Sequence, residues 1–205
     1  MSGQLPIVVG VTGASGAIYA RRLLQVLLAS AVPVDLIVSD AARIVIREEE
    51  NADIGEPLPR DWLRSWLEIE DVAGLHAHSN ADLAAPPSSG SYRTRGMVVV
   101  PCSGSALGAI AHGLSRDLIQ RAADVTLKEA RPLVLVPRET PLNRVHLANL
   151  LTAHDAGARI LPASPAFYHH PGDILGLADF IVGRILDSLA VEHDLYDRWS
   201  GPAHS

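Results

Sequence analysis

Short apolar segments recur along this chain and alternate with segments whose apolar residues follow the period of a helix. A strand that is apolar on both faces is typical of a parallel sheet whose connections are helices. The pattern therefore predicts a doubly wound α/β fold, in which a parallel sheet lies between two layers of helices. The predicted strands are 7–11, 34–38, 97–100, 133–136 and 159–161, and the predicted helices are 17–29, 40–48, 62–67, 115–130, 141–154 and 173–190.

Length and composition narrow the class of protein. The 205 residues suit one domain, 1–205, with a poorly defined C-terminal tail from about residue 191 and a less regular middle at 50–95. The net charge of −6, without a long basic run, argues against nucleic acid as the partner. No apolar run approaches the roughly 20 residues of a membrane span, and no export signal begins the chain. With a single cysteine, Cys102, these features predict a cytoplasmic protein.

A glycine-rich turn follows the first predicted strand. Gly10, Gly13 and Gly16 lie three residues apart in the segment GVTGASGA, which leads into a helix. Such a turn brings the N–H groups of a helix N-terminus close to a ligand phosphate, so a phosphorylated ligand is predicted here. Asp40 could bind the ribose of a nicotinamide cofactor, and TGASG is similar to the short-chain dehydrogenases. None of the four tyrosines has a lysine four places on, so the dehydrogenase chemistry is excluded.

The end of the strand 97–100 carries small polar residues. It leads into the segment PCSGSALGAIAHG, which opens another helix, and Ser103 and Ser105 could hold the edge of a planar heterocycle. Cys102 could be a nucleophile, but the sequence shows no paired base, so a small buried residue is the better interpretation. The histidines lack cysteine or carboxylate neighbours at metal-ligand spacing, and no metal site is predicted.

Arg138 and Glu139 follow the strand 133–136, before the next helix. They could form an exposed ion pair worth at most about 1 kcal/mol. Alternatively they bind a ligand, because open α/β sheets bind ligands at the carboxyl ends of their strands. The sequence around the pair leaves both interpretations open.

Four further side chains are ambiguous when taken singly. Arg121 and Lys128 lie two turns apart on one helix face, but each has an aspartate four residues before it, the spacing of an ordinary surface pair. Arg184 could pair with Asp187 at the surface. Tyr168 could pack in the core and do nothing more.

Segments along nearly the whole chain are similar, in order, to the UbiX-type flavin prenyltransferases. They are GVTGASGA, Ser39, PCS, LIQRAADVTLKEARPLVLVPRETPL, HLANLL, GARILPASPAFYHHP and DFIVGRILDSL. The segments 118–142 and 157–171 are the most specific of these. The resemblance implies a flavodoxin-like α/β domain that assembles into a dodecamer, with active sites shared between subunits.

The resemblance also implies roles for individual residues. FMN would be bound by Gly13, Ala14, Ser15, Ser39, Ser103, Gly104, Ser105, Ala106 and Arg138. The dimethylallyl phosphate would be bound by Arg121, Lys128, Arg138, Tyr168 and Arg184, with Arg121 reaching in from a neighbouring subunit. Glu139 would be the acid beside the leaving phosphate, Ser15 would belong to its proton relay, and Glu49 and Trp199 would line the site.

The implied reaction joins a dimethylallyl group from dimethylallyl monophosphate to N5 and C6 of reduced FMN. No metal is needed if the cationic side chains neutralise the phosphate, and the prenylated FMN would serve UbiD-type decarboxylases. Two positions depart from the family pattern. Leu83 stands where some members have an aromatic residue in the prenyl pocket, and Ala106 lacks a hydroxyl that others offer to the flavin.

Three alternatives stay open. A non-catalytic FMN-binding protein would explain the strand-end loops but not the cations and the tyrosine directed at a phosphate. A decarboxylase of the related cysteine-decarboxylating type uses a histidine base after the first strand region, and residues 42–50 contain none. An aromatic-acid decarboxylase would need a carboxylate site that the sequence does not separate from the phosphate site.

Overall fold

The computed structural model describes residues 4–52, 55, 58–168 and 170–198. They form one six-stranded, all-parallel sheet with the order β3-β2-β1-β4-β5-β6. The strands are β1 (Ile7–Val11), β2 (Val34–Val38), β3 (Leu75–Ser79), β4 (Gly96–Cys102), β5 (Leu133–Pro137) and β6 (Arg159–Ile160). The helices are α1 (Ala17–Ala29), α2 (Asp40–Glu50), α3 (Arg60–Leu67), α4 (Gly104–Ala111), α5 (Leu118–Lys128), α6 (Arg144–Asp155) and α7 (Ile174–Ser188), with a 3-10 turn, η1 (Pro86–Ser88).

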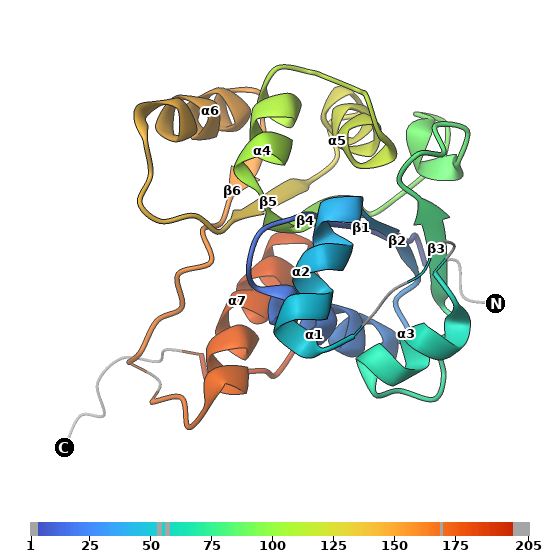
Figure 1. The fold of residues 1–205 in the computed structure, drawn as a ribbon, viewed down its shortest axis with the longest axis vertical. Coiled ribbons are helices and arrows are strands. Elements are labelled where there is room, and N and C mark those ends of the chain that lie inside the picture. Colours follow the sequence, from blue (N-terminus) through green and yellow to red (C-terminus); the bar gives the residue numbers. More distant parts are fainter. Residues whose placement is uncertain (1–3, 53–54, 56–57, 169, 199–205) are drawn as a thin grey trace.

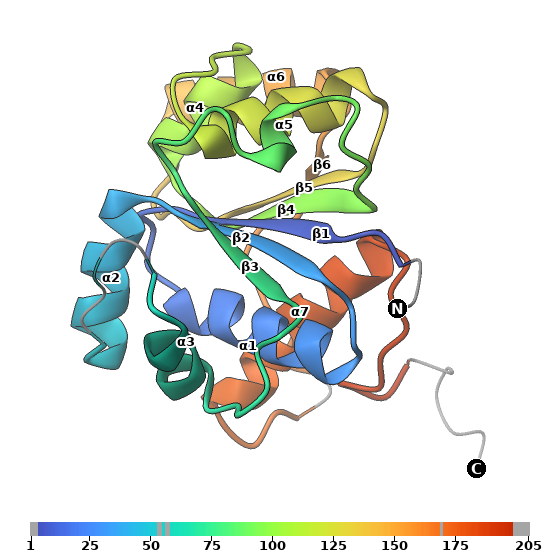
Figure 2. The ribbon, with the colours of Figure 1, turned by 90° about the vertical axis from the view of Figure 1, so that its right-hand side faces the viewer.

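Two layers of helices enclose the sheet, which confirms the predicted doubly wound fold. Helices α1, α3 and α7 lie on one face, and α4, α5 and α6 lie on the other (Figures 1 and 2). Alternate side chains of β1 enter the two cores, because successive residues of a strand point to opposite faces. Ile7 and Val9 pack in the core with α1 and α7, whereas Val8 packs in the core with α5. None of the described helices is long and apolar enough to cross a membrane.

Strand β3 is the element that the sequence pattern did not predict, because it falls in the irregular middle of the chain. Its sequence, LHAHS, is largely polar, and only Leu75 is buried. An edge strand needs no continuous apolar run, since one side of it has no neighbouring strand. With β3 set aside, the other five strands follow the order 2-1-3-4-5, which is the flavodoxin-like arrangement.

Two helices begin later than predicted because a side chain caps each of them. The helix predicted at 115–130 spans Leu118–Lys128, and the Asp117 carboxylate accepts from the Gln120 N–H at 2.9 Å. The helix predicted at 141–154 starts at Arg144, after Asn143, whose side chain accepts from the His146 N–H at 2.9 Å. Asp117 and Asn143 are N-cap residues, a type of helix start signal that is separate from the apolar periodicity. The periodicity alone therefore places both helix starts too early.

The winding of the chain reverses between β1 and β4, which are neighbours in the sheet. Helix α1, which follows β1, covers one face, whereas α4, which follows β4, covers the other (Figure 2). The connections therefore diverge above the carboxyl ends of these two strands, which is where a doubly wound sheet is expected to have its ligand crevice. Open α/β sheets bind their ligands at this kind of switch point.

Candidate active site

The loops that follow three strands are tied together at the carboxyl edge of the sheet. The Thr12 hydroxyl donates to the Pro101 carbonyl oxygen at 2.7 Å and accepts from the Ser103 N–H at 2.8 Å. The Ser39 N–H donates to the Val11 carbonyl oxygen at 3.0 Å. These bonds bring the glycine turn, Ser39 and the 103–106 turn together at the carboxyl edge of the sheet.

The glycine turn has no room for a side chain on its inner side. A Cβ atom on Gly13 would overlap the Cβ of Ala41 and would lie 3.1 Å from the Ala41 carbonyl carbon. Gly16 has a φ of 114°, in the region that favours glycine. The turn is therefore closely packed against the start of α2, which fixes its position relative to Ser39.

A side chain of the protein itself binds two amides at the start of α1, where the sequence predicts a ligand phosphate. The Glu49 carboxylate accepts from the Gly16 N–H at 2.9 Å and from the Ala17 N–H at 2.9 Å. Burial opposes ionisation of this carboxyl, but hydrogen bonds from the Ser15 side chain and the two amides, with the nearby Arg138 charge, lower the pKa of Glu49. The protein thus places its own anion at this helix N-terminus, where the dipole favours negative charge.

Two of the serines that the sequence predicts to bind the flavin also act as helix N-caps. The Ser39 hydroxyl accepts from the Ala42 N–H at 3.2 Å, and the Ser103 hydroxyl accepts from the Ala106 N–H at 3.3 Å. A hydroxyl that accepts from an amide keeps its own O–H as a donor. Both serines can therefore donate a hydrogen bond to a ligand while they cap α2 and α4. Ser105, whose hydroxyl is 3.4 Å from that of Ser103, adds a third hydroxyl.

Arg138 points into the crevice and not toward Glu139. Its Nε donates to the Ser15 carbonyl oxygen at 3.1 Å. Within the described part of the chain no ion pair joins Arg138 to Glu139, whose carboxylate accepts from the Thr140 N–H at 3.1 Å. The interpretation of these two residues as a simple surface pair is therefore wrong. Arg138, Ser15 and Glu49 instead form one polar cluster beside the glycine turn.

Cys102 is buried beneath the crevice, as predicted. Burial raises the pKa of its thiol to about 12, so the thiol is protonated at neutral pH and is not a nucleophile. Among residues 4–52, 55, 58–168 and 170–198, no group of three or more His, Cys, Asp or Glu side chains could hold a metal ion.

Arg184 is on α7 and Tyr168 packs against this helix, and neither contacts the Arg138, Ser15 and Glu49 cluster in the contacts that the structure gives among the described residues. The Tyr168 side chain is 60% exposed, and its ring meets the Phe180 ring edge-on at 6.1 Å. The Arg184 Nη1 is 3.1 Å from an Asp187 carboxylate oxygen, the pair that the sequence offered as the alternative to a ligand contact. Predicted roles of these two residues in phosphate binding stay predictions. Trp199 lies outside the described residues.

Asp187 is a residue that the sequence analysis did not single out as part of the site. Besides Arg184, its carboxylate accepts from the Tyr196 hydroxyl at 3.1 Å and from the Arg198 Nη2 at 2.8 Å. The residues after 191 therefore fold back along α7, and a Cβ on Gly183 would overlap the Tyr196 ring. The contacts of Asp187 with Tyr196 and Arg198 have no signature in local sequence spacing, because they join α7 to the tail that follows it.

Arg121 and Lys128 do not reach the crevice of their own chain. Arg121 pairs with Asp124 at 2.8 Å, and Lys128 pairs with Glu129 at 2.9 Å. The predicted pairs with residues four places earlier are absent from the described structure, and Asp117 caps the helix instead. Lys128 is the last residue of α5, which leads into the start of β5. It therefore lies near the amino edge of the sheet, opposite the strand-end loops.

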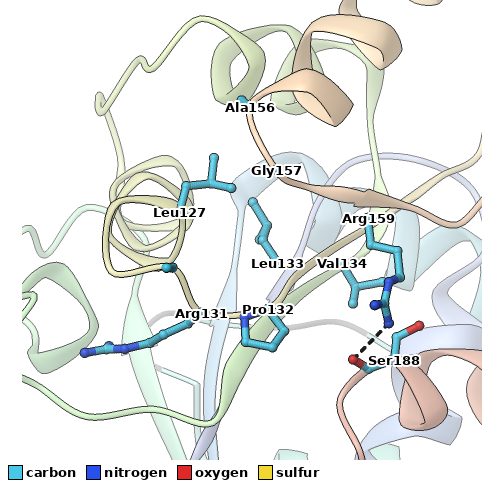
Figure 3. Close-up of a pocket in the computed structure, with 10 residues that line it drawn as sticks. Leu127, Arg131, Pro132, Leu133, Val134, Ala156, Gly157, Arg159 and Ser188 are labelled. Atoms are coloured by element: carbon cyan, nitrogen blue, oxygen red, sulfur yellow. Dashed lines mark hydrogen bonds between the residues drawn. The ribbon is translucent and has the colours of Figure 1, made fainter.

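A cavity of about 430 Å³ also lies at the amino edge, away from the crevice. Its lining includes Leu127, Leu133 and Arg159, and the Arg159 Nη1 donates to the Ser188 carbonyl oxygen at 3.1 Å (Figure 3). The Arg131 side chain extends away from this cavity (Figure 3). The cavity contains none of the residues that the sequence predicted for the site.

Comparisons with known proteins agree with this architecture. Residues 1–186 match the family model described as Flavoprotein. The chain is 48% identical over 207 residues to the flavin prenyltransferase UbiX of Streptomyces coelicolor, with 96% of each chain covered. It is similar to the crystal structure of AnUbiX (PadA1) in complex with FMN and dimethylallyl pyrophosphate, with a TM-score of 0.84, 42% identity and coverage of 97% and 98%. It is also similar to a dodecameric FMN-dependent UbiX-like decarboxylase from Escherichia coli O157:H7, with a TM-score of 0.83, 39% identity and coverage of 96% and 100%.

The packing of Gly13 predicts that Gly13→Ala destabilises the protein. The added methyl must displace the start of α2, and overpacking of this kind typically costs about 1–3 kcal/mol. The free energy of unfolding, measured with urea, should fall by that amount. Gly172→Ala is the matched control, because a Cβ there meets nothing within 4 Å. Equal stability of the two variants would contradict the close packing at Gly13.

The lowered pKa of Glu49 predicts a pH-dependent contribution to stability. A carboxyl whose folded pKa is depressed stabilises the fold above its usual pKa of about 4.3 and loses this effect as the pH falls through the folded value. Glu49→Gln should therefore reduce the free energy of unfolding at pH 7 by about 0.3–1 kcal/mol, and the difference should vanish in acid. Glu48→Gln is the matched control, because Glu48 is one residue earlier, exposed, and makes no hydrogen bond to the start of α1 in the described structure. A pH-independent loss in Glu49→Gln would contradict the electrostatic role.

Proposed function

The chain belongs to the flavoprotein family, among its UbiX-type flavin prenyltransferases, and we propose that it joins a dimethylallyl group to N5 and C6 of reduced FMN. We propose dimethylallyl monophosphate as the donor. The observation that carries the proposal is the polar cluster of Arg138, Ser15 and Glu49 at the switch-point crevice. It combines a cation for a phosphate, a hydroxyl and a carboxylate at the place where a flavin fits.

The residues of the crevice fit FMN. Gly13 lets the turn pack closely against Ala41, and this packing fixes the backbone beside Ser39 where the flavin would bind. Ser39 and Ser103 keep O–H donors for the ligand. They cap α2 and α4, whereas Glu49 binds the start of α1. Reduced FMN supplies the nucleophilic nitrogen when it is bound.

The cations would act on the departing phosphate. Cleavage of the allylic C–O bond leaves both bonding electrons on the phosphate oxygen and a positive charge on the dimethylallyl group. Arg138, Lys128 and Arg184 would stabilise the phosphate as its charge grows, and the Tyr168 hydroxyl would donate to it. Glu139, exposed beside Arg138, would transfer protons during these steps.

A single chain does not bring these groups together, so the proposal includes an oligomer. Lys128 at the amino edge would serve the crevice of another subunit, as would Arg121. Helix α6 exposes several large apolar side chains, and apolar side chains gathered on an exposed element suit a protein contact. These are Val145, Leu147 and Leu151, which are 64%, 54% and 61% exposed. We propose a homododecamer, the assembly of the Escherichia coli relative.

The product and its setting are also proposals. Prenylated FMN would serve as cofactor of a UbiD-type decarboxylase, the recipient that the family resemblance implies. A free thiol and a reduced flavin substrate both suit a reducing compartment, and we place the protein in the cytoplasm.

Product mass tests the proposal directly. The purified protein is incubated without oxygen with reduced FMN and either dimethylallyl monophosphate or dimethylallyl pyrophosphate. We expect a flavin heavier by the prenyl group, together with inorganic phosphate, from the monophosphate. Bound but unchanged FMN would indicate a non-catalytic flavin-binding protein. Release of CO₂ from an aromatic acid or a peptide cysteine without any flavin adduct would indicate a decarboxylase.

Glu139→Gln should reduce turnover and leave flavin binding nearly unchanged. The amide keeps the shape of the side chain but removes its titratable group, and a positioned general acid–base contributes about 100- to 10,000-fold. The measurements are single-turnover rates at saturating donor and FMN affinity by fluorescence quenching. Turnover close to that of the wild type would show that Glu139 transfers no proton.

Arg184→Ala should act on donor binding. Loss of a charge-assisted hydrogen bond worth roughly 1.5–3 kcal/mol should raise the KM for the donor by about 10- to 150-fold. Flavin affinity should change little, since Arg184 is on α7 and makes no contact with the glycine turn or the capping serines in the described structure. A large loss of FMN affinity with an unchanged KM for the donor would assign Arg184 to the flavin instead.

A further inference from the structure

A buried carboxylate lies inside the sheet, and the proposed mechanism does not use it. Asp35 is in the middle of β2 and is 1% exposed. One of its oxygens is 2.7 Å from His78 Nε2, and the other accepts from the Tyr92 hydroxyl at 2.9 Å. A charge in this position is tolerated only if it is paired and hydrogen-bonded. The arrangement therefore holds Tyr92 firmly, because release of the tyrosine would leave a buried charge without one of its partners.

Tyr92 anchors a loop to the sheet. Residues 88–94, which we call the 88–94 loop, run beside α5. Burial, with the neighbouring Asp35 charge, raises the pKa of Tyr92 to about 12, so its hydroxyl remains a donor. Arg131 holds the loop from the other side: its Nη1 donates to the Tyr92 carbonyl oxygen at 2.7 Å and its Nη2 to the Gly90 carbonyl oxygen at 2.8 Å. The loop is fixed at both the sheet and the end of α5.

The same loop contacts the two cations of α5. The Arg121 Nε donates to the Ser88 carbonyl oxygen at 3.0 Å. A Cβ on Gly90 would lie 2.8 Å from Lys128 Nζ and would overlap the Glu129 carboxylate that pairs with it. The Lys128–Glu129 pair therefore lies directly against the backbone of Gly90, and a side chain there would have to shift the ends of both.

We infer that Tyr92 and Gly90 are positioning residues for the donor phosphate. Tyr92, through its hydrogen bond to Asp35, holds the 88–94 loop in place, and Arg121 and Lys128 lie against this loop. The inference rests on the proposed function, in which these two cations bind the phosphate in a neighbouring subunit. Binding loses less conformational entropy when the cations are already held in place before the donor arrives. A loosened loop should therefore weaken donor binding.

Two variants and one control test this role in the FMN-loaded protein. Tyr92→Phe removes only the hydroxyl that Asp35 accepts, and Gly90→Ala adds only the methyl beside Lys128. Each should raise the KM and the Kd for dimethylallyl monophosphate about three- to tenfold, with FMN affinity unchanged. Gly74→Ala is the control, because a Cβ there makes an ordinary contact at 3.6 Å with Leu28. Variants that bind the donor like the wild type overturn the inference.

A double-variant cycle separates positioning from general destabilisation. If Gly90 acts through Lys128, Gly90→Ala should weaken donor binding much less in a Lys128→Ala background than in the wild type. Additive losses, or a parallel loss of FMN affinity, would assign Gly90 a structural role only and overturn the inference. If Tyr92→Phe does not fold, the Gly90 cycle still decides. A wild-type protein that binds no dimethylallyl monophosphate refutes the proposed function itself, and the inference falls with it.

Discussion

The hydrogen bonds of one buried hydroxyl hold the site together. Thr12 donates to the end of β4 and accepts from the turn that follows it, so two strand ends that are 89 residues apart in sequence are fixed side by side. These are the strands between which the winding of the chain reverses. The glycine turn, the capping serines and Arg138 are all positioned relative to this junction.

The charge distribution at the strand ends is set by Glu49, a carboxylate of the protein that lies where a ligand anion could otherwise bind. Glu49 accepts from two amides at the start of α1, so an internal carboxylate already balances part of the positive end of this helix. Arg138 is held by the Ser15 carbonyl oxygen and faces the Glu49 charge, but no carboxylate neutralises it through a direct ion pair in the described structure. It therefore retains capacity to bind an anionic group.

The sequence was sufficient where structure is dictated locally. Apolar runs such as the one in β5 predict buried strands, and the spacing of Gly13 and Gly16 predicts a tight turn before a helix. Strand β3 could not be found in this way, since only Leu75 of its five residues is buried and the rest show no apolar pattern. The contact of Glu49 with Gly16 spans 33 residues, and the contact of Arg138 with Ser15 spans 123. Such pairings depend on how helices pack on the sheet, which no local spacing encodes.

Lys128 and Arg138 belong to opposite edges of one sheet. On the proposed assembly, each chain is therefore a donor of cations to one neighbour and a host for the cations of another. A chain that lacks Arg138 would still lend a sound Lys128, and a chain that lacks Lys128 would still host a sound crevice. Co-assembly of these two inactive chains would recreate some complete sites, so the corresponding alleles would complement each other. Two alleles damaged at the same edge would not.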